Sequence, residues 1–232
     1  DETHPLALGS GGHATSRMVY DFLYDADLIF GIGCSFAISS FATRMPKNKR
    51  YIHATLDPVD LNKDIQAEIG IAGDAKLTLQ ALIAELKTLD LKNAKSRKDA
   101  TPAAIAKVRA EWMQEWLPTL TSDQSPMTPY RVIHELNQLV DKSKVVITHD
   151  AGSPRDQLIP FWQATHPLTY IGWGKTTQLG YGLPLAMGAK LAKPDHLCIN
   201  VWGDAAIGFT GMDFETAVRE RIPILSILFN NF

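Results

Sequence analysis

The sequence predicts an α/β protein with two open parallel-sheet domains and flanking helices. Short continuous apolar runs alternate with segments whose apolar residues recur at helical spacing. Polar residues and glycines gather where the apolar runs end, which is the edge at which open α/β sheets bind ligands. A charged, alanine-rich stretch interrupts this pattern. We therefore expect a partial Rossmann-like domain over 1–90, a linker with one helix over 91–125 and a second domain over 126–232.

The bulk composition is that of an ordinary globular protein. Of the 232 residues, 45% are hydrophobic and 21% are charged, and the formal net charge is −2. This balance predicts no broad attraction to nucleic acid, and no apolar run approaches the roughly 20 residues that span a membrane. Cys34 and Cys198 lie in apolar runs without a CxxC spacing, which predicts two buried, reduced thiols. We expect a cytoplasmic protein without nucleic-acid or membrane partners.

The first domain is predicted to contain two strands and a helix. Residues 26–36 (ADLIFGIGCSF) predict a buried parallel strand, because the run is continuous, apolar and ended by glycine. Residues 50–57 predict a second strand, and leucines at helical spacing predict a helix over 75–89. In the linker we expect an exposed helix from Pro102 to Trp116, with one face packed on a domain.

The second domain is predicted to alternate helices and strands from Met127 onward. Thr128 is the expected cap of its first helix and Pro129 the first helical residue. The remaining pattern predicts strands over 144–150, 196–204 and 223–231 and helices after Ser153-Pro154 and over 211–222. A glycine-punctuated segment over 172–192 is expected to lead into a small-residue helix. The chain starts without Met and ends directly after an apolar run. We therefore expect a piece of a longer protein, with both domains incomplete.

The clearest site in the sequence pairs Asp204 with Asn231. Each follows an apolar strand, and a βαβ unit brings the carboxyl ends of parallel strands to one sheet edge. A carboxylate and an amide oxygen suit Mg²⁺, with phosphate oxygens completing its coordination. Gly203, Ala205 and Ala206 leave room for a phosphate beside backbone N–H groups. The alternative is a strand-ending Asp and an Asn in a turn.

Residues 203–231 (GDAAIGFTGMDFETAVRERIPILSILFNN) resemble the thiamine-diphosphate motif, which begins Gly-Asp-Gly and ends Asn-Asn at this spacing. Ala205 departs from the family's usual Gly; it keeps the backbone N–H but disfavours a positive φ. The chain from Met127 onward resembles the diphosphate-binding domain of acetolactate synthases and related 2-oxo-acid enzymes. Their central domain is similar to three further segments, 1–18, 25–36 and 56–86.

The resemblance implies cofactor contacts at five more positions. Gly152 and Ser153 would touch the diphosphate, although an ordinary strand-to-helix turn capped by Ser153 or by the preceding Asp is the alternative. The segment Thr177-Gln178-Leu179 matches the part of the family under the bent middle of the cofactor. The carbonyl of Thr177 would accept from the aminopyrimidine, and Leu179 would separate the two rings; plain core packing is the alternative for Leu179.

The resemblance implies thiamine diphosphate and Mg²⁺ as cofactors and a 2-oxo acid or related small ketone as substrate. Acetolactate-synthase-like carboligation is favoured over a 2-oxo-acid decarboxylase or a related lyase or hydrolase. A non-catalytic nucleotide- or flavin-binding homologue is the alternative from another class. The activating glutamate would lie in an N-terminal domain, usually of a partner subunit. This implies a full-length homodimer or homotetramer and an inactive fragment, with Glu215 and Glu220 solvated in a helix.

FAD is left open by the resemblance. The glycines of residues 9–12 and of Gly31-Ile32-Gly33 resemble part of the FAD region of many acetolactate synthases, but Cys34-Ser35 stands where those enzymes often carry Ala-Arg. Residues 31–33 lack the third glycine of the dinucleotide fingerprint and do not predict NAD binding. His149 lies beside the proposed site, and either reaches substrate or has a structural role.

Overall fold

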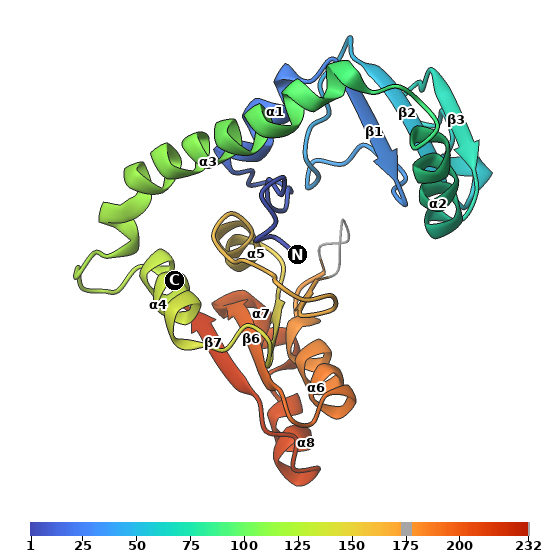
Figure 1. Ribbon diagram of the computed structural model, residues 1–232. Helices are drawn as coiled ribbons and strands as arrows, with labels where there is room; N and C mark the ends of the chain where they lie inside the picture. Colours follow the sequence, from blue (N-terminus) through green and yellow to red (C-terminus); the bar gives the residue numbers. More distant parts are fainter. Residues whose placement is uncertain (173–177, 232) are drawn as a thin grey trace.

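The computed structural model has the predicted α/β fold, with two separate parallel sheets (Figure 1). It describes residues 1–172 and 178–231, except for the side chains of 92–99. The first sheet has the order β1-β2-β3, and the second has the order β5-β4-β6-β7. The strands are β1 (Leu28–Ile32), β2 (Arg50–Thr55), β3 (Ile69–Ala72), β4 (Val145–His149), β5 (Tyr170–Ile171), β6 (Leu197–Gly203) and β7 (Leu225–Phe229).

The first sheet is more open than its apolar strands predict. β1 is an edge strand, and its Leu28 and Phe30 are 40% and 37% exposed. The prediction of a buried strand over 26–36 is therefore wrong on burial, because β2 is the one strand that pairs with β1 among the described residues. The flanking helices are α1 (Arg17–Asp25), η1 (Pro58–Asp60) and α2 (Ala75–Leu86).

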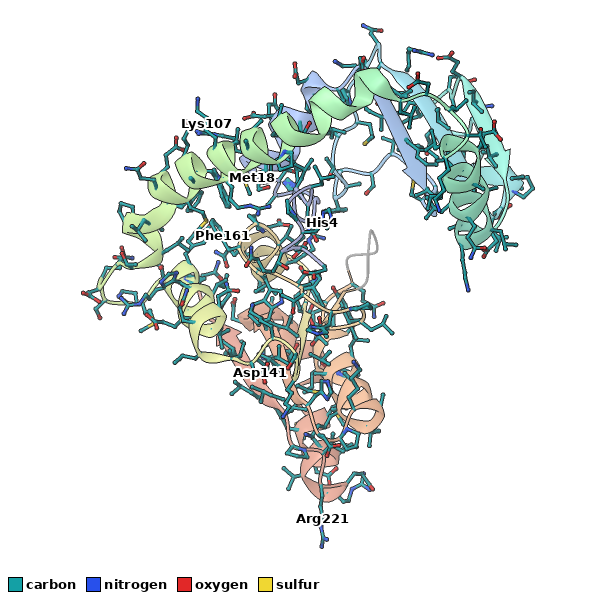
Figure 2. All side chains as sticks on the ribbon, viewed as in Figure 1. His4, Met18, Lys107, Asp141, Phe161 and Arg221 are labelled. Carbon is teal, nitrogen blue, oxygen red and sulfur yellow. The ribbon has the colours of Figure 1, made fainter. Side chains whose placement is uncertain are left out.

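A single long helix, α3 (Lys92–Leu120), joins the two sheets (Figure 1). The prediction of a helix from Pro102 to Trp116 was too short, because the Ala-, Lys- and Arg-rich residues before Pro102 favour helix and extend it toward the amino end. Its predicted packing face is confirmed. Trp112 is 7% exposed and stacks on Phe161 with ring centroids 4.8 Å apart. Figure 2 labels Phe161, which lies close to α3.

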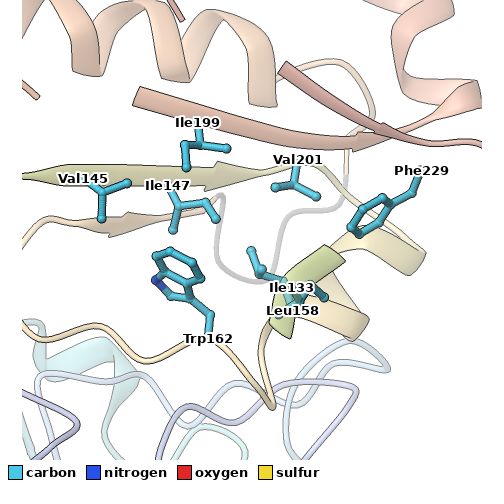
Figure 3. Close-up of a cluster of buried hydrophobic side chains, with 8 residues drawn as sticks. All are labelled: Ile133, Val145, Ile147, Leu158, Trp162, Ile199, Val201 and Phe229. Carbon is cyan, nitrogen blue, oxygen red and sulfur yellow. The ribbon is translucent and has the colours of Figure 1, made fainter. Parts of the chain in front are cut away.

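The second sheet has its helices on both faces. One buried cluster joins Ile133 and Trp162 to the strands (Figure 3), and the other places Leu183 against Trp202. All five residues of β4 are buried, as its apolar run predicts. The helices of this part are α4 (Pro129–Leu139), α5 (Ser153–Leu158), α6 (Gly182–Ala192), α7 (Asp204–Thr210) and α8 (Asp213–Arg219).

One prediction for this region needs correction, and one helix was not predicted. The helix expected over 211–222 is shorter, Asp213–Arg219, and a separate helix α7 precedes it. Gly208 and Gly211 lower the helical signal of that segment, so the sequence did not predict α7. By contrast, Thr128 caps α4 as predicted, with its hydroxyl accepting from the backbone N–H of Arg131 at 3.1 Å.

The first residues of the chain pack against the second sheet region instead of the first sheet. The backbone N–H of Glu2 donates to the carbonyl of Ala164 at 2.9 Å, and the Ala164 N–H donates to the Glu2 carboxylate at 2.7 Å. Both cysteines are free thiols, but Cys34 is only half-buried. Within residues 1–172 and 178–231, no helix is long and apolar enough to cross a membrane.

Candidate functional site

The ends of β6 and β7 bring the predicted metal ligands to one edge of the second sheet. The two strands are parallel neighbours, with Gly203 in register with Phe229. Asp204 follows β6 directly, and Asn231 lies two residues beyond β7. Both line a cavity of about 760 Å³. The structure therefore brings Asp204 and Asn231 together at this edge.

The loop after β4 forms another wall of the same cavity. Gly152 has a φ of +82° and a ψ of −148°, a conformation that favours glycine, and a Cβ there would meet open space. Ser153 begins α5 and is exposed to the cavity. The N-terminus of α5 has no side-chain cap, so the alternative in which Ser153 or Asp150 caps this turn is wrong.

Small residues line the cavity at the start of α7. Gly203, Ala205 and Ala206 all contribute to its wall, as predicted. Ala205 lies in the first turn of α7 and is not among the residues with positive φ. The departure from Gly at this position therefore causes no backbone strain. The first-turn N–H groups of α7 have no acceptor within the helix, which suits this end to an anion.

Asp150 holds the next part of the site together, a role that the sequence did not predict. Its side chain is fully buried and accepts hydrogen bonds from three backbone N–H groups, those of Ala151, Gly180 and Gly182, at 2.8–3.1 Å. Thr210 of α7 donates to the Gly180 carbonyl at 2.7 Å. The turn at Gly180 is thus fixed from two sides. The sequence signal was an acidic residue inside a buried run at a strand end.

The segment under the expected cofactor bend is described in part. Thr177 lies outside the described residues. Gln178 is exposed. Leu179 is half-buried, packs against the cluster around Trp202 and also lines the 760 Å³ cavity. Leu179 thus packs against the core and also lines the cavity, and its position between the cofactor rings stays a prediction.

His149 is buried at the end of β4, with 4% of its surface exposed. Its Nδ1 lies 3.1 Å from the carbonyl oxygen of Asp150. Burial lowers the pKa of His149, and the nearby Asp150 carbonyl opposes that shift to a smaller extent. The imidazole is therefore neutral near pH 7. Its Nε2 lies against Gly172, where a Cβ would be only 2.1 Å away.

The two glycines of β1 and its end have a packing role at Gly31 and a conformational role at Gly33. A Cβ on Gly31 would lie 2.1 Å from the ring of Phe36, so this glycine makes room for an aromatic side chain. Gly33 has a φ of +64° and donates its N–H to the carbonyl of Ala54 at 2.9 Å. Neither feature by itself indicates a phosphate-binding site.

Glu215 and Glu220, expected to be solvated, are exposed and pair with Arg219.

The ligands at the second sheet edge fit a metal-bound diphosphate. Among the described residues, no group of three or more His, Cys, Asp or Glu could hold a metal alone. One carboxylate and one amide, beside small residues and the first turn of α7, instead suit Mg²⁺ whose other ligands are phosphate oxygens. Fold and site together define an α/β protein whose second sheet edge carries residues suited to a metal-bound phosphate group.

Comparisons with known proteins agree with this class. The family description "Thiamine pyrophosphate enzyme, C-terminal TPP binding domain" matches residues 150–232, and "Thiamine pyrophosphate enzyme, central domain" matches residues 1–82. The chain belongs to the thiamine pyrophosphate enzyme family.

Curated relatives cover nearly all of this chain. The probable acetolactate synthase large subunit of Methanococcus aeolicus is 29% identical over 99% of this chain and 40% of its own length. The mitochondrial acetolactate synthase catalytic subunit of Saccharomyces cerevisiae is 28% identical over 97% of this chain and 33% of its own length. The pyruvate oxidase of Lactiplantibacillus plantarum is 24% identical over 99% of this chain. The chain thus spans about 40% or less of the length of these relatives.

Proposed function

We propose that this chain contributes the diphosphate-binding edge of a thiamine-diphosphate-dependent enzyme that acts on a 2-oxo acid. The observation that carries the proposal is the pairing of Asp204 and Asn231 at the ends of two adjacent parallel strands, over one cavity. Relatives named acetolactate synthase support carboligation as the reaction. Decarboxylation or a related cleavage remains the alternative within the family.

Each residue of the edge has a proposed role. Asp204 and Asn231 hold Mg²⁺, and Gly152 and Ser153 contact the diphosphate. Leu179 shapes the bound cofactor from its half-buried position. Thiamine diphosphate, when bound, supplies an electron sink for the charge that develops when a bond beside a carbonyl breaks.

The non-catalytic alternative loses part of its support. It rested on Ala205 and on the altered glycine segment of the first domain. Ala205 occupies a right-handed helical turn, so it keeps its N–H available without the strain that a positive φ would impose. The altered glycine segment concerns only whether FAD binds. FAD binding and a homodimeric or homotetrameric assembly are further proposals for the full-length protein.

The anchor is tested by titrating the full-length protein with thiamine diphosphate, with and without Mg²⁺. Asp204→Ala should abolish Mg²⁺-dependent binding and Asn231→Ala should weaken it strongly, because Mg²⁺ demands near-octahedral oxygen coordination. Asp195→Ala is the matched control. It removes an exposed carboxylate at the opposite end of β6 and should bind as the wild type does.

An Asp204→Ala protein that binds the cofactor as tightly as wild type, and still requires Mg²⁺, would contradict the proposed anchor.

A further inference from the structure

A second cavity lies where the first residues of the chain meet the second sheet region. It has a volume of about 390 Å³ and lies beside the carboxyl ends of β4 and β5. That size is typical of small-molecule sites. We call it the arginine cavity; five of its lining residues define it: Gly12, Thr43, His149, Arg155 and Tyr170.

Arg155 is the one fully charged side chain among the described residues that line this cavity. Only 5% of the side chain is exposed. Asp156, which does not line the cavity, places Oδ1 2.9 Å from both Nε and Nη2 of Arg155. The ring of Phe41 lies 5.6 Å from the guanidinium carbon. Within the described part of the chain, Nη1 makes no hydrogen bond, so one edge of a buried cation remains available.

His149 does not add a second charge to the cavity. Burial lowers its pKa, so the imidazole is neutral near pH 7. The Tyr170 hydroxyl is buried and its pKa is raised by burial, so it also stays neutral. The one charge in the described lining of the arginine cavity is therefore that of Arg155, whose ion-pair partner Asp156 lies outside the lining. Such a wall favours an anionic ligand over a neutral or cationic one.

The walls of the cavity are held in place before any ligand arrives. A Cβ on Gly12 would lie 3.0 Å from Cδ1 of Ile159, and one on Gly11 would lie 2.4 Å from Oγ1 of Thr43. Gly12 therefore allows the N-terminal segment to approach the end of α5 closely, and Gly11 allows it to approach Thr43. The two hydrogen bonds between Glu2 and Ala164 fix the same segment to the second sheet region.

We propose that the arginine cavity binds the carboxylate of the 2-oxo acid, with Arg155 as its ion-pair partner. The inference rests on the proposed function and assigns the substrate's anionic group to residues of this chain. A planar guanidinium presents its donors in the geometry that a carboxylate accepts. Arg155 lies two residues after Ser153, so α5 contributes to both the arginine cavity and the cofactor cavity.

The test measures the binding of pyruvate to the full-length protein by saturation-transfer NMR, in the absence of thiamine diphosphate and Mg²⁺. Arg155→Met keeps an apolar stem but removes the charge, and should raise the dissociation constant about tenfold. Asp156→Asn should bind pyruvate as well as wild type or more tightly, because Arg155 loses its acidic neighbour. Methyl pyruvate, which carries no charge, should bind weakly to all variants.

Arg17→Met is the matched control, because it also removes an ion-paired arginine, but one on α1 beside Glu115. It should leave pyruvate binding unchanged, and thermal unfolding should show that each variant is folded. Four outcomes would overturn the proposal: no pyruvate binding by wild type, equal binding by Arg155→Met, equal binding of methyl pyruvate, or displacement by an equal concentration of inorganic phosphate. Because no cofactor is present, these outcomes are separate from failure of the Asp204 anchor.

Discussion

The two sheets both place glycines where their strands end, yet the glycines have different roles. In the last part of β1, Gly31 makes room for the ring of Phe36, and a Cβ would collide with it. After β4, Gly152 adopts a positive φ beside an open cavity, and a Cβ would meet nothing. A glycine at a strand end is therefore one sequence signal with two physical causes. Only the surroundings of its Cβ separate packing from access for a ligand.

The largest expected effect is on the turn at Gly180 in the second sheet region, which Asp150 holds. Asp150→Asn should lower the free energy of unfolding by about 3 kcal/mol, because both carboxylate oxygens accept from backbone N–H groups and an amide NH₂ would face one of them. Chemical denaturation of the full-length protein measures this, with Asp195→Asn as the exposed control. A loss below about 0.5 kcal/mol would show that Asp150 does not fix the turn.

Two substitutions test whether the glycines of the two sheets have different roles. Gly31→Ala should cost about 2 kcal/mol of stability through overpacking against Phe36, with cofactor affinity unchanged. Gly152→Ala should weaken cofactor binding, because the loop would leave its positive φ. Gly188→Ala in α6, where a Cβ meets open space, is the control and should not destabilise. Loss of cofactor binding in Gly31→Ala would remove the distinction.

A smaller, pH-dependent effect is expected at His149. Burial lowers its pKa below the unfolded value of about 6.5, so the unfolded state binds more protons as the pH falls below about 6.5. Stability should therefore decrease on acidification, and decrease less steeply in His149→Gln. Thermal unfolding across this range compares the two slopes. Equal slopes would show that His149 does not contribute to the acid sensitivity of the second sheet region.

The smallest effect on binding is expected at Leu179. Leu179→Ala should leave Mg²⁺-dependent cofactor affinity within about twofold of wild type and lower turnover of the full-length enzyme, because this side chain shapes the cofactor and does not hold its diphosphate. Parallel titration and steady-state kinetics separate the two. A large loss of affinity with unchanged turnover would reverse the assignment.

Much of the second sheet was predictable because its signals are local. Apolar runs predicted β4, β6 and β7, and the geometry of parallel strands predicted that Asp204 and Asn231 share an edge. The role of Asp150 was not predictable, since its partners Gly180 and Gly182 lie about 30 residues further along the chain.

Helix α7 and the exposure of β1 were missed for different reasons. Gly208 and Gly211 weaken the helical pattern around α7, whose neighbours in the fold nevertheless support it. The apolar run of β1 predicts burial on both faces, but burial depends on which elements pack against the strand. The lining of the arginine cavity likewise comes from distant segments, so its arginine carries no signal in the sequence.

The central claim is that the ends of β6 and β7 hold a divalent metal against a diphosphate. The most direct measurement uses Mn²⁺ in place of Mg²⁺ and records the ³¹P signals of thiamine diphosphate exchanging with the full-length protein. The wild type and Asp195→Ala should show strong paramagnetic broadening, and Asp204→Ala should show none beyond that of free Mn²⁺ with the cofactor. Undiminished protein-dependent broadening in Asp204→Ala would contradict the claim.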